Sequence, residues 1–194
     1  MSTGVADYFA CNSEIAKAVR DNPGSAHPFE LLYTKEAELP IDRYFLNSMA
    51  GHNVYLRLLA LERTFPAIVG GMLDDRRLLI ENAGSGPGHD MIGVMRTNPD
   101  LASKVHIRNI DPDVAALKIG QEEVERLGLS KSFGWEAGKF NEVEARGADL
   151  VPLIGVLCPL DMRTCRLIMR VTKRFATPRC ASTPVNSSEV NCAP

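Results

Sequence analysis

Residues 78–88 of this chain are Leu-Leu-Ile-Glu-Asn-Ala-Gly-Ser-Gly-Pro-Gly. An apolar run of strand length ends there in a glycine-rich turn, and an amphipathic segment follows over residues 89–96. The order strand, tight turn and helix presents backbone N–H groups to a bound ligand, and a Cβ at Gly84, Gly86 or Gly88 would obstruct its approach. We therefore expect a nucleotide-like ligand at this turn.

Further strand-like segments follow the glycine turn. They span residues 104–110, 132–135 and 148–157, and the last is almost wholly apolar, which is typical of a parallel strand covered on both faces. Helical patterns separate them from one another and from the first strand, residues 78–82. This alternation predicts an α/β fold with a doubly wound parallel sheet and right-handed crossovers.

The clearest helix in the sequence follows the second strand. Asp111 is expected to cap its N-terminus, Pro112 to take the first helical position, and Asp113 to place an acid in the first turn. Gly128 is expected to end it. A further helix is predicted over residues 161–175.

The N-terminal third differs in character from the rest of the chain. Residues 1–25 are small and polar, and we expect a flexible arm there. Residues 26–73 show helical spacing of apolar side chains over 28–38 and 41–63, and Pro66 is expected to start one more helical turn. The prediction is a helical cap packed in front of the sheet.

Composition restricts the classes of function. The chain has 194 residues, 24% charged residues and a formal net charge of −2, which gives no support for a nucleic-acid partner. No apolar run reaches the length of a membrane span, so we expect no membrane partner and a cytoplasmic location. We also expect no metal and no disulfide framework, because histidines and cysteines are scattered; the five cysteines are Cys11, Cys158, Cys165, Cys180 and Cys192.

Taken together, residues 78–160 resemble the class I S-adenosylmethionine-dependent methyltransferases. Residues 84–88 resemble the first motif of that family, which holds the methionine part of the cofactor, and residues 109–113 resemble the second, at the ribose. Residues 136–140 lie where the adenine-facing loop would be, and residues 148–160 resemble the strand that borders the methyl-transfer site. The resemblance rests on the order and spacing of these segments.

The resemblance implies a Rossmann-like domain over residues 74–175 that uses S-adenosylmethionine to methylate a small-molecule substrate. It also implies which residues contact the cofactor: Asn82, Ala83, Gly84, Ser85, Gly86, Gly88, Asn109, Ile110, Asp111 and Gly155.

The sequence departs from the family at two acidic positions and in the extent of the sheet. Asn82 and Asn109 stand where the family has acids, and Glu81 is expected on the opposite face of its strand. No strand can be drawn after the fourth, and residues 176–194 are expected to be disordered. We therefore expect a sheet that is incomplete after the fourth strand, in a truncated or unusual variant. Because Pro152 suits an edge strand, we expect self-association through that edge.

The chemistry implied by the resemblance needs no fixed catalytic triad, because methyl transfer depends mainly on alignment. His89 is a candidate base for an acceptor that must lose a proton, and the alternative is a helix-start residue that packs on the turn. His89 also occupies the third glycine position of the dinucleotide pattern, which disfavours an NAD-dependent oxidoreductase. A catalytically inactive methyltransferase-like fragment or binding module is the second alternative.

Overall fold

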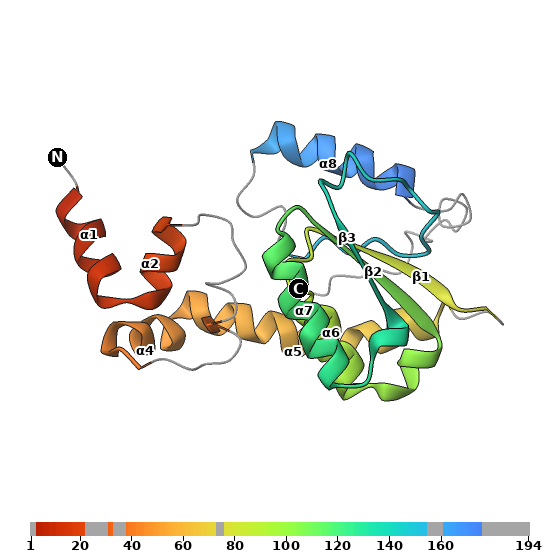
Figure 1. Cartoon of the computed structure of the whole chain (residues 1–194), viewed down its shortest axis with the longest axis horizontal. Coiled ribbons are helices and arrows are strands. Elements are labelled where there is room, and N and C mark those ends of the chain that lie inside the picture. The colour runs from red at the N-terminus through yellow and green to blue at the C-terminus, as the bar shows by residue number, and fades with distance from the viewer. Residues whose placement is uncertain (1–2, 22–30, 33–37, 73–75, 155–160, 176–194) are drawn as a thin grey trace, which may run out of the picture.

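Helices cover both faces of a short parallel sheet. The computed structural model describes residues 3–21, 31–32, 38–72, 76–154 and 161–175. The predicted disordered tail, residues 176–194, and most of the predicted helix over 28–38 lie outside the described residues. As Figure 1 shows, one face carries α5 (Met49–Gly70), α6 (His89–Thr97) and α7 (Val114–Arg126), and the other carries α8 (Met162–Phe175).

The sheet consists of β1 (Leu78–Ala83), β2 (Val105–Asp111) and β3 (Phe133–Ala137), in the order β1-β2-β3 and all parallel. The predicted first three strands are confirmed. Single turns of 3-10 helix, η1 (Pro99–Ser103) and η2 (Ser130–Ser132), precede β2 and β3. In the register of β1 and β2, Asn82 is the partner of Asn109. The predicted doubly wound, Rossmann-like α/β arrangement is thus present in short form.

The predicted fourth strand, residues 148–157, is reduced to one isolated parallel bridge within the described residues. Leu150 bridges Ile80, on the side of β1 away from β2. The carboxylate of Asp149, next to this bridge, accepts a hydrogen bond from the Leu79 N–H at 2.9 Å. Residues 151–154 form no strand, and residues 155–157 lie outside the described part.

Two apolar clusters hold the layers together. The larger one joins the β1 and β2 side chains on one face to α5, α6 and α7; its members include Phe65, Val69, Ile80, Met91, Met95, Ile107 and Val124. The smaller one joins Ile110 to Val171 and Phe175 of α8, and Phe140 stacks on Phe175 with ring centroids 3.9 Å apart. Each fully buried aliphatic side chain contributes roughly 1.5–3 kcal/mol, so the larger cluster dominates stability.

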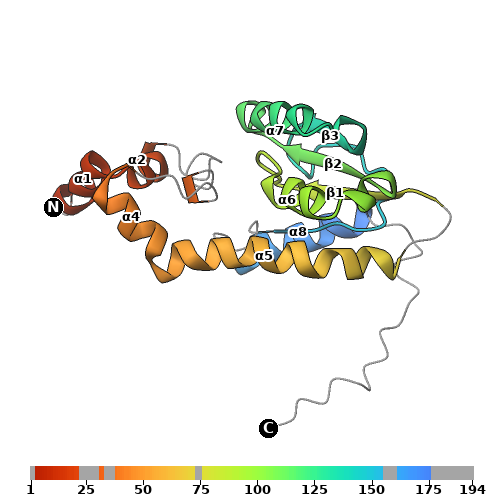
Figure 2. The same ribbon diagram turned by 90° about the horizontal axis from the view of Figure 1, so that it is seen from below.

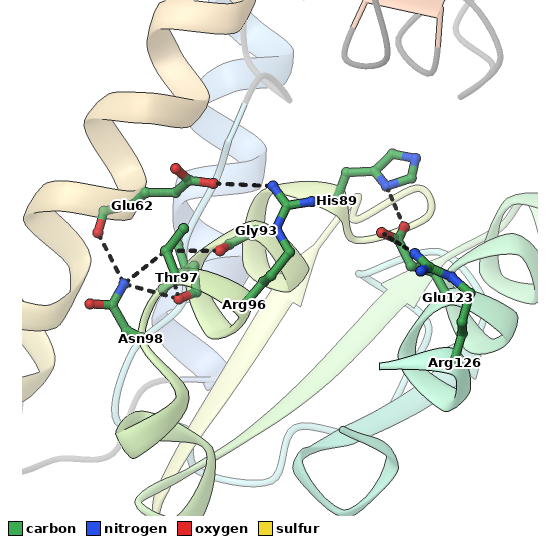
Figure 3. Close-up of polar contacts among 9 residues, drawn as sticks. Glu62, His89, Gly93, Arg96, Thr97, Asn98, Glu123 and Arg126 are labelled. Carbon is green, nitrogen blue, oxygen red and sulfur yellow. Dashed lines mark hydrogen bonds and ion pairs between the residues drawn. The ribbon is translucent and has the colours of Figure 1, made fainter. Parts of the chain in front are cut away.

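Helix α5 continues through Pro66, which corrects the prediction that this proline starts a separate turn. Proline has no N–H for the carbonyl four residues before it, which here belongs to Glu62. Asn98, directly after α6, supplies the missing donor: its Nδ2 lies 3.2 Å from the Glu62 carbonyl oxygen (Figure 3). The residue that follows α6 therefore replaces the hydrogen-bond donor that the proline inside α5 lacks.

The N-terminal segment is helical where it is described, as α1 (Thr3–Asn12) and α2 (Glu14–Asp21). The flexibility expected of residues 1–25 stays a prediction. Asp42 of α4 (Pro40–Asn47) is buried and caps α2: its carboxylate accepts from the Ser13 hydroxyl at 2.5 Å and the Ile15 N–H at 3.2 Å. Figure 2 shows α1, α2 and α4 grouped beyond the N-terminal end of α5. The division at residue 73 stays a prediction.

The N-cap of α7 is Asp113, which corrects the expectation for Asp111. The Asp113 carboxylate accepts hydrogen bonds from the N–H groups of Ala115 and Ala116, at 3.0 and 3.1 Å. Asp111 is the last residue of β2, and its carboxylate serves the neighbouring turn instead. The expected helix end at Gly128 is confirmed: this glycine follows the C-cap with a φ of 71°.

Candidate functional site

The glycine turn lies between the end of β1 and the start of α6, as predicted. Gly84, Gly86 and Gly88 all have positive φ angles, of 63°, 51° and 76°. Gly88 is also the N-cap of α6, where it needs the left-handed conformation that other residues adopt only at a cost of roughly 1–2 kcal/mol. The residue types at these positions are therefore required by the shape of the turn.

The end of β2 holds the turn in place. The carbonyl oxygen of Ile110 accepts hydrogen bonds from the N–H groups of Gly84 and Ser85, at 2.9 and 3.2 Å. The Asp111 carboxylate accepts a third from Gly86, at 2.8 Å. Asp111 therefore organises the turn, and a direct contact between its carboxylate and a cofactor stays a prediction.

Two buried amides replace the expected acids beneath the turn. Asn82 donates from Nδ2 to Oδ1 of Asn109 at 2.9 Å, and Asn109 is 0% exposed. Among the described residues, the Nδ2 group of Asn109 has no hydrogen-bond partner. A Cβ added at Gly88 would lie 2.9 Å from that nitrogen. The site thus places an unsatisfied donor directly below the backbone of the turn.

Glu81 lies on the opposite face of β1, as the sequence predicts, and cannot substitute for either acid. Its carboxylate pairs with Arg108 at 2.5 Å, and Arg108 also pairs with Glu136 of β3. Burial raises the pKa of Glu81, while the Arg108 guanidinium opposes that shift. This cluster belongs to the face of the sheet that α8 covers.

His89 is the first residue of α6, and its ring contacts α7. Its Nδ1 atom lies 3.1 Å from the carboxylate of Glu123 (Figure 3). This hydrogen bond lowers the pKa of Glu123. The contact joins the start of α6 to α7 and fits the alternative that His89 is a helix-start residue. A role as base stays a prediction.

Gly120 is a supporting residue that the sequence interpretation missed. A Cβ at Gly120 would lie 2.0 Å from the carbonyl oxygen of Pro87 and 2.5 Å from the Trp135 ring. Helix α7 therefore passes directly under the turn, and only glycine allows this approach. A glycine inside an otherwise strong helix costs roughly 1 kcal/mol relative to alanine, and that local cost was the available signal.

The structure brings nine of the ten predicted cofactor residues together at the ends of β1 and β2 and in the turn between β1 and α6. Ala83 and Ile110 have buried side chains, so only their backbone groups can face a ligand. Gly155 lies outside the described residues. The cofactor-binding role of the other nine stays a prediction.

Comparisons with known proteins concern the fold. No protein-family model and no curated protein matches the sequence. A possible exported protein from Bordetella parapertussis superposes with a TM-score of 0.69 and 17% identity, over 90% of this chain and 58% of that one. Magnesium protoporphyrin IX methyltransferase from Synechocystis PCC 6803, solved with bound S-adenosylmethionine, superposes with a TM-score of 0.58 and 15% identity. The superposition covers 90% of this chain and 71% of that one.

The chain shares its Rossmann-like α/β fold with this methyltransferase. A third structure, provisionally described as an O-methyltransferase from Nostoc punctiforme PCC 73102, shares it with a TM-score of 0.50 and 20% identity, over 84% of this chain and 50% of that one. The resemblance seen in the sequence is therefore confirmed at the level of the fold. The chain spans 58% and 50% of the lengths of the Bordetella and Nostoc proteins.

Proposed function

We propose that the protein transfers a methyl group from S-adenosylmethionine to a small-molecule acceptor. The observation that supports this most is the buried Nδ2 donor of Asn109, which lies beneath the glycine turn. A buried donor without a partner costs roughly 1–3 kcal/mol, and a ribose oxygen would satisfy it. The methyltransferase fold is the second support.

The residues present fit such a cofactor in a specific way. Asn109 would hold the ribose, and the backbone of residues 84–88 would hold the methionine part. When bound, S-adenosylmethionine supplies a methyl group that is already activated for transfer. The protein then has to hold the acceptor within about 3.5 Å of that group and in line with it.

The amides also favour a second candidate, a methyltransferase-like binding module without activity. An amide forms no charge-assisted hydrogen bond with a hydroxyl, so each acid-to-amide exchange weakens cofactor binding by about 1 kcal/mol. Asn82 and Asn109 together would lower affinity about thirtyfold, since 1.4 kcal/mol corresponds to a factor of ten. Binding and turnover therefore need separate measurements.

Isothermal titration of the full chain with S-adenosylmethionine, S-adenosylhomocysteine and NAD tests the cofactor. Heat of binding with the first two ligands and none with NAD is the expected result. Heat with NAD alone would support the oxidoreductase, and silence with all three would refute a cofactor site. Transfer of a labelled methyl group to a panel of small molecules then separates the enzyme from the binding module.

Gly86→Val and Gly128→Val form a matched pair for that titration. Both glycines have positive φ, at 51° and 71°, so both variants carry the cost of a strained backbone. Gly128 has open space around it at the end of α7. Loss of binding in Gly86→Val only would support the turn as the site, and equal loss in both would contradict it.

We also propose that the protein is cytoplasmic. Cys11 is a free thiol, which fits a reducing compartment. Immunodetection in fractionated cells of the source organism tests this proposal. Recovery of the protein outside the cytoplasm would refute it.

A further inference from the structure

Helix α8 carries a concentration of positive charge that the proposed methyl transfer does not use. Five of its fourteen residues are basic and none is acidic, in a chain whose formal net charge is −2. All five side chains are exposed, and among the described residues none of them pairs with a carboxylate: Arg163, Arg166, Arg170, Lys173 and Arg174. We call these five residues the α8 basic face.

Helical geometry places the five cations side by side. Successive residues turn by about 100° around a helix axis, so all five fall within an arc of about 100°. Val171 and Phe175 project from the other side of α8 and are buried against the core. The cations therefore lie mainly on the part of α8 that is turned away from these two residues.

Exposed apolar side chains border the basic face on both sides. By the same geometry, Met162 and Met169 lie along one border and Leu167 along the other. The exposed fraction is 70% for Met162, 49% for Met169 and 59% for Leu167. Leu167 is a large apolar side chain that this molecule leaves exposed, so another surface could bury it.

Hydrogen bonds stabilise both ends of α8. The Asp161 carboxylate caps α8 by accepting from the N–H groups of Arg163 and Thr164, at 2.7 and 2.9 Å. Hydrogen bonds from Thr164, then from Arg163, lower the pKa of Asp161. At the other end, the Phe175 carbonyl accepts from the N–H of Ala148 at 2.5 Å. A partner would therefore meet a preformed surface.

We propose that the α8 basic face binds the surface of an anionic lipid bilayer. Each Lys or Arg near such a surface strengthens attachment roughly fivefold. Nucleic acid would use the same cations, but it offers no apolar phase for Met162, Leu167 and Met169, whereas the headgroup boundary of a bilayer does. The whole chain is also slightly acidic, with a pI near 6.1, unlike a domain that binds nucleic acid.

This proposal departs from the expectation of no membrane partner, which rested on the lack of a spanning segment. The described residues contain no helix of sufficient length and hydropathy to span a bilayer. The α8 basic face lies across the sheet from α6 and the glycine turn, so the proposal does not depend on the proposed methyl transfer.

Co-sedimentation of the full chain with lipid vesicles tests the proposal. We expect binding to vesicles that mix phosphatidylcholine with phosphatidylserine, weaker binding as salt rises, and none to phosphatidylcholine alone. The triple variant Arg163→Gln, Arg166→Gln, Arg170→Gln should bind about a hundredfold more weakly, since each cation contributes roughly fivefold.

A second triple variant is the matched control: Lys104→Gln, Lys118→Gln and Lys131→Gln remove the same charge from exposed positions outside α8. It should bind like the unaltered chain. Equal loss in both triples would overturn the proposal, because net charge alone would then explain binding. If the unaltered chain failed to bind the vesicles that contain phosphatidylserine, the proposal would also be overturned. Binding of duplex RNA without binding of these vesicles would overturn it as well.

The double variant Leu167→Gln, Met169→Gln tests the apolar borders and keeps all five cations. Weaker binding of this variant at high salt supports a bilayer, because burial of apolar side chains is not screened by salt. Unchanged binding at high salt would overturn the assignment to lipid in favour of a purely electrostatic anion surface. Circular dichroism on all variants checks that α8 remains folded.

Discussion

Gly88 and Gly128 adopt nearly the same backbone conformation in different surroundings, with φ angles of 76° and 71°. A Cβ at Gly88 would meet the amide of Asn109, whereas a Cβ at Gly128 would meet nothing within 4 Å. We predict that Gly88→Ala destabilises the fold by about 1 kcal/mol more than Gly128→Ala, since both share the backbone cost. Urea unfolding of the two variants measures the difference. Equal losses would show that the turn does not press on Asn109.

Glu123 supports a pH prediction, because the hydrogen bond from His89 lowers its pKa in the folded state. A lowered folded pKa means that ionised Glu123 favours the fold. This stabilisation is complete above the unfolded pKa, about 4.3, and is lost as the pH falls through the folded pKa. Glu123→Gln should therefore lower the free energy of unfolding by about 1 kcal/mol at neutral pH. On acidification the variant should lose less stability than the unaltered protein.

Urea midpoints measured from neutral pH to below pH 4 check this prediction. Glu122→Gln is the control, because Glu122 is exposed and its only described ion pair is with Lys118, at 3.9 Å. We expect the control to follow the pH profile of the unaltered protein. If the urea midpoint of the Glu122→Gln control also depended less on pH, the role given to Glu123 would be contradicted.

At the scale of elements, α5 and α6 depend on one another through the proline inside α5. Asn98 donates to the Glu62 carbonyl that Pro66 leaves without a donor. Asn98→Ala should cost about 1–2 kcal/mol in the natural background, because it leaves that carbonyl unsatisfied. In a Pro66→Ala background the helix supplies its own N–H, so the same substitution should cost less.

A double-mutant cycle on urea stability measures this coupling. A coupling energy of about 0.5 kcal/mol or more is expected between positions 66 and 98. Thr172→Ala paired with Pro66→Ala is the control, since the Thr172 hydroxyl donates within α8, to the Ile168 carbonyl. Additive behaviour of the Asn98 pair would contradict the proposed compensation.

At the scale of the whole molecule, self-association through the sheet edge stays a prediction. In the described part, the segment at Leu150 meets β1 through one bridge and forms the border of the sheet on that side. Sedimentation velocity should show an average mass that rises with concentration. Leu153→Lys should suppress the rise, because a charge in the segment at this border opposes backbone pairing with a second copy.

Val114→Lys is the control for that experiment. It adds the same charge to α7, at a side chain that is 63% exposed and away from this border. Association unchanged by Leu153→Lys, or abolished equally by Val114→Lys, would refute the edge as the interface. A monodisperse monomer at every concentration would refute self-association altogether.

Local patterns were sufficient for much of the fold. The apolar run before Gly84 predicted β1, and the left-handed glycines predicted the turn, because each depends only on neighbouring residues. Asp113 shows the limit of such patterns: two aspartates, Asp111 and Asp113, could cap α7, and the competing bonds of Asp111 decided between them. Leu167 shows a second limit of local patterns. Helical spacing of apolar residues does not reveal how many faces of a helix are buried by other elements.

The sequence by itself determined the order of strand, glycine turn and helix, the parallel arrangement, and the resemblance to methyltransferases. Only the tertiary structure decided that Asn82 donates to Asn109, that Gly120 lies beneath Pro87, and that Asp149 accepts from the Leu79 N–H of β1. The physical reason is distance along the chain. Periodicity and backbone conformation are set by adjacent residues, whereas these contacts depend on strand register and on how crossover helices pack against the sheet.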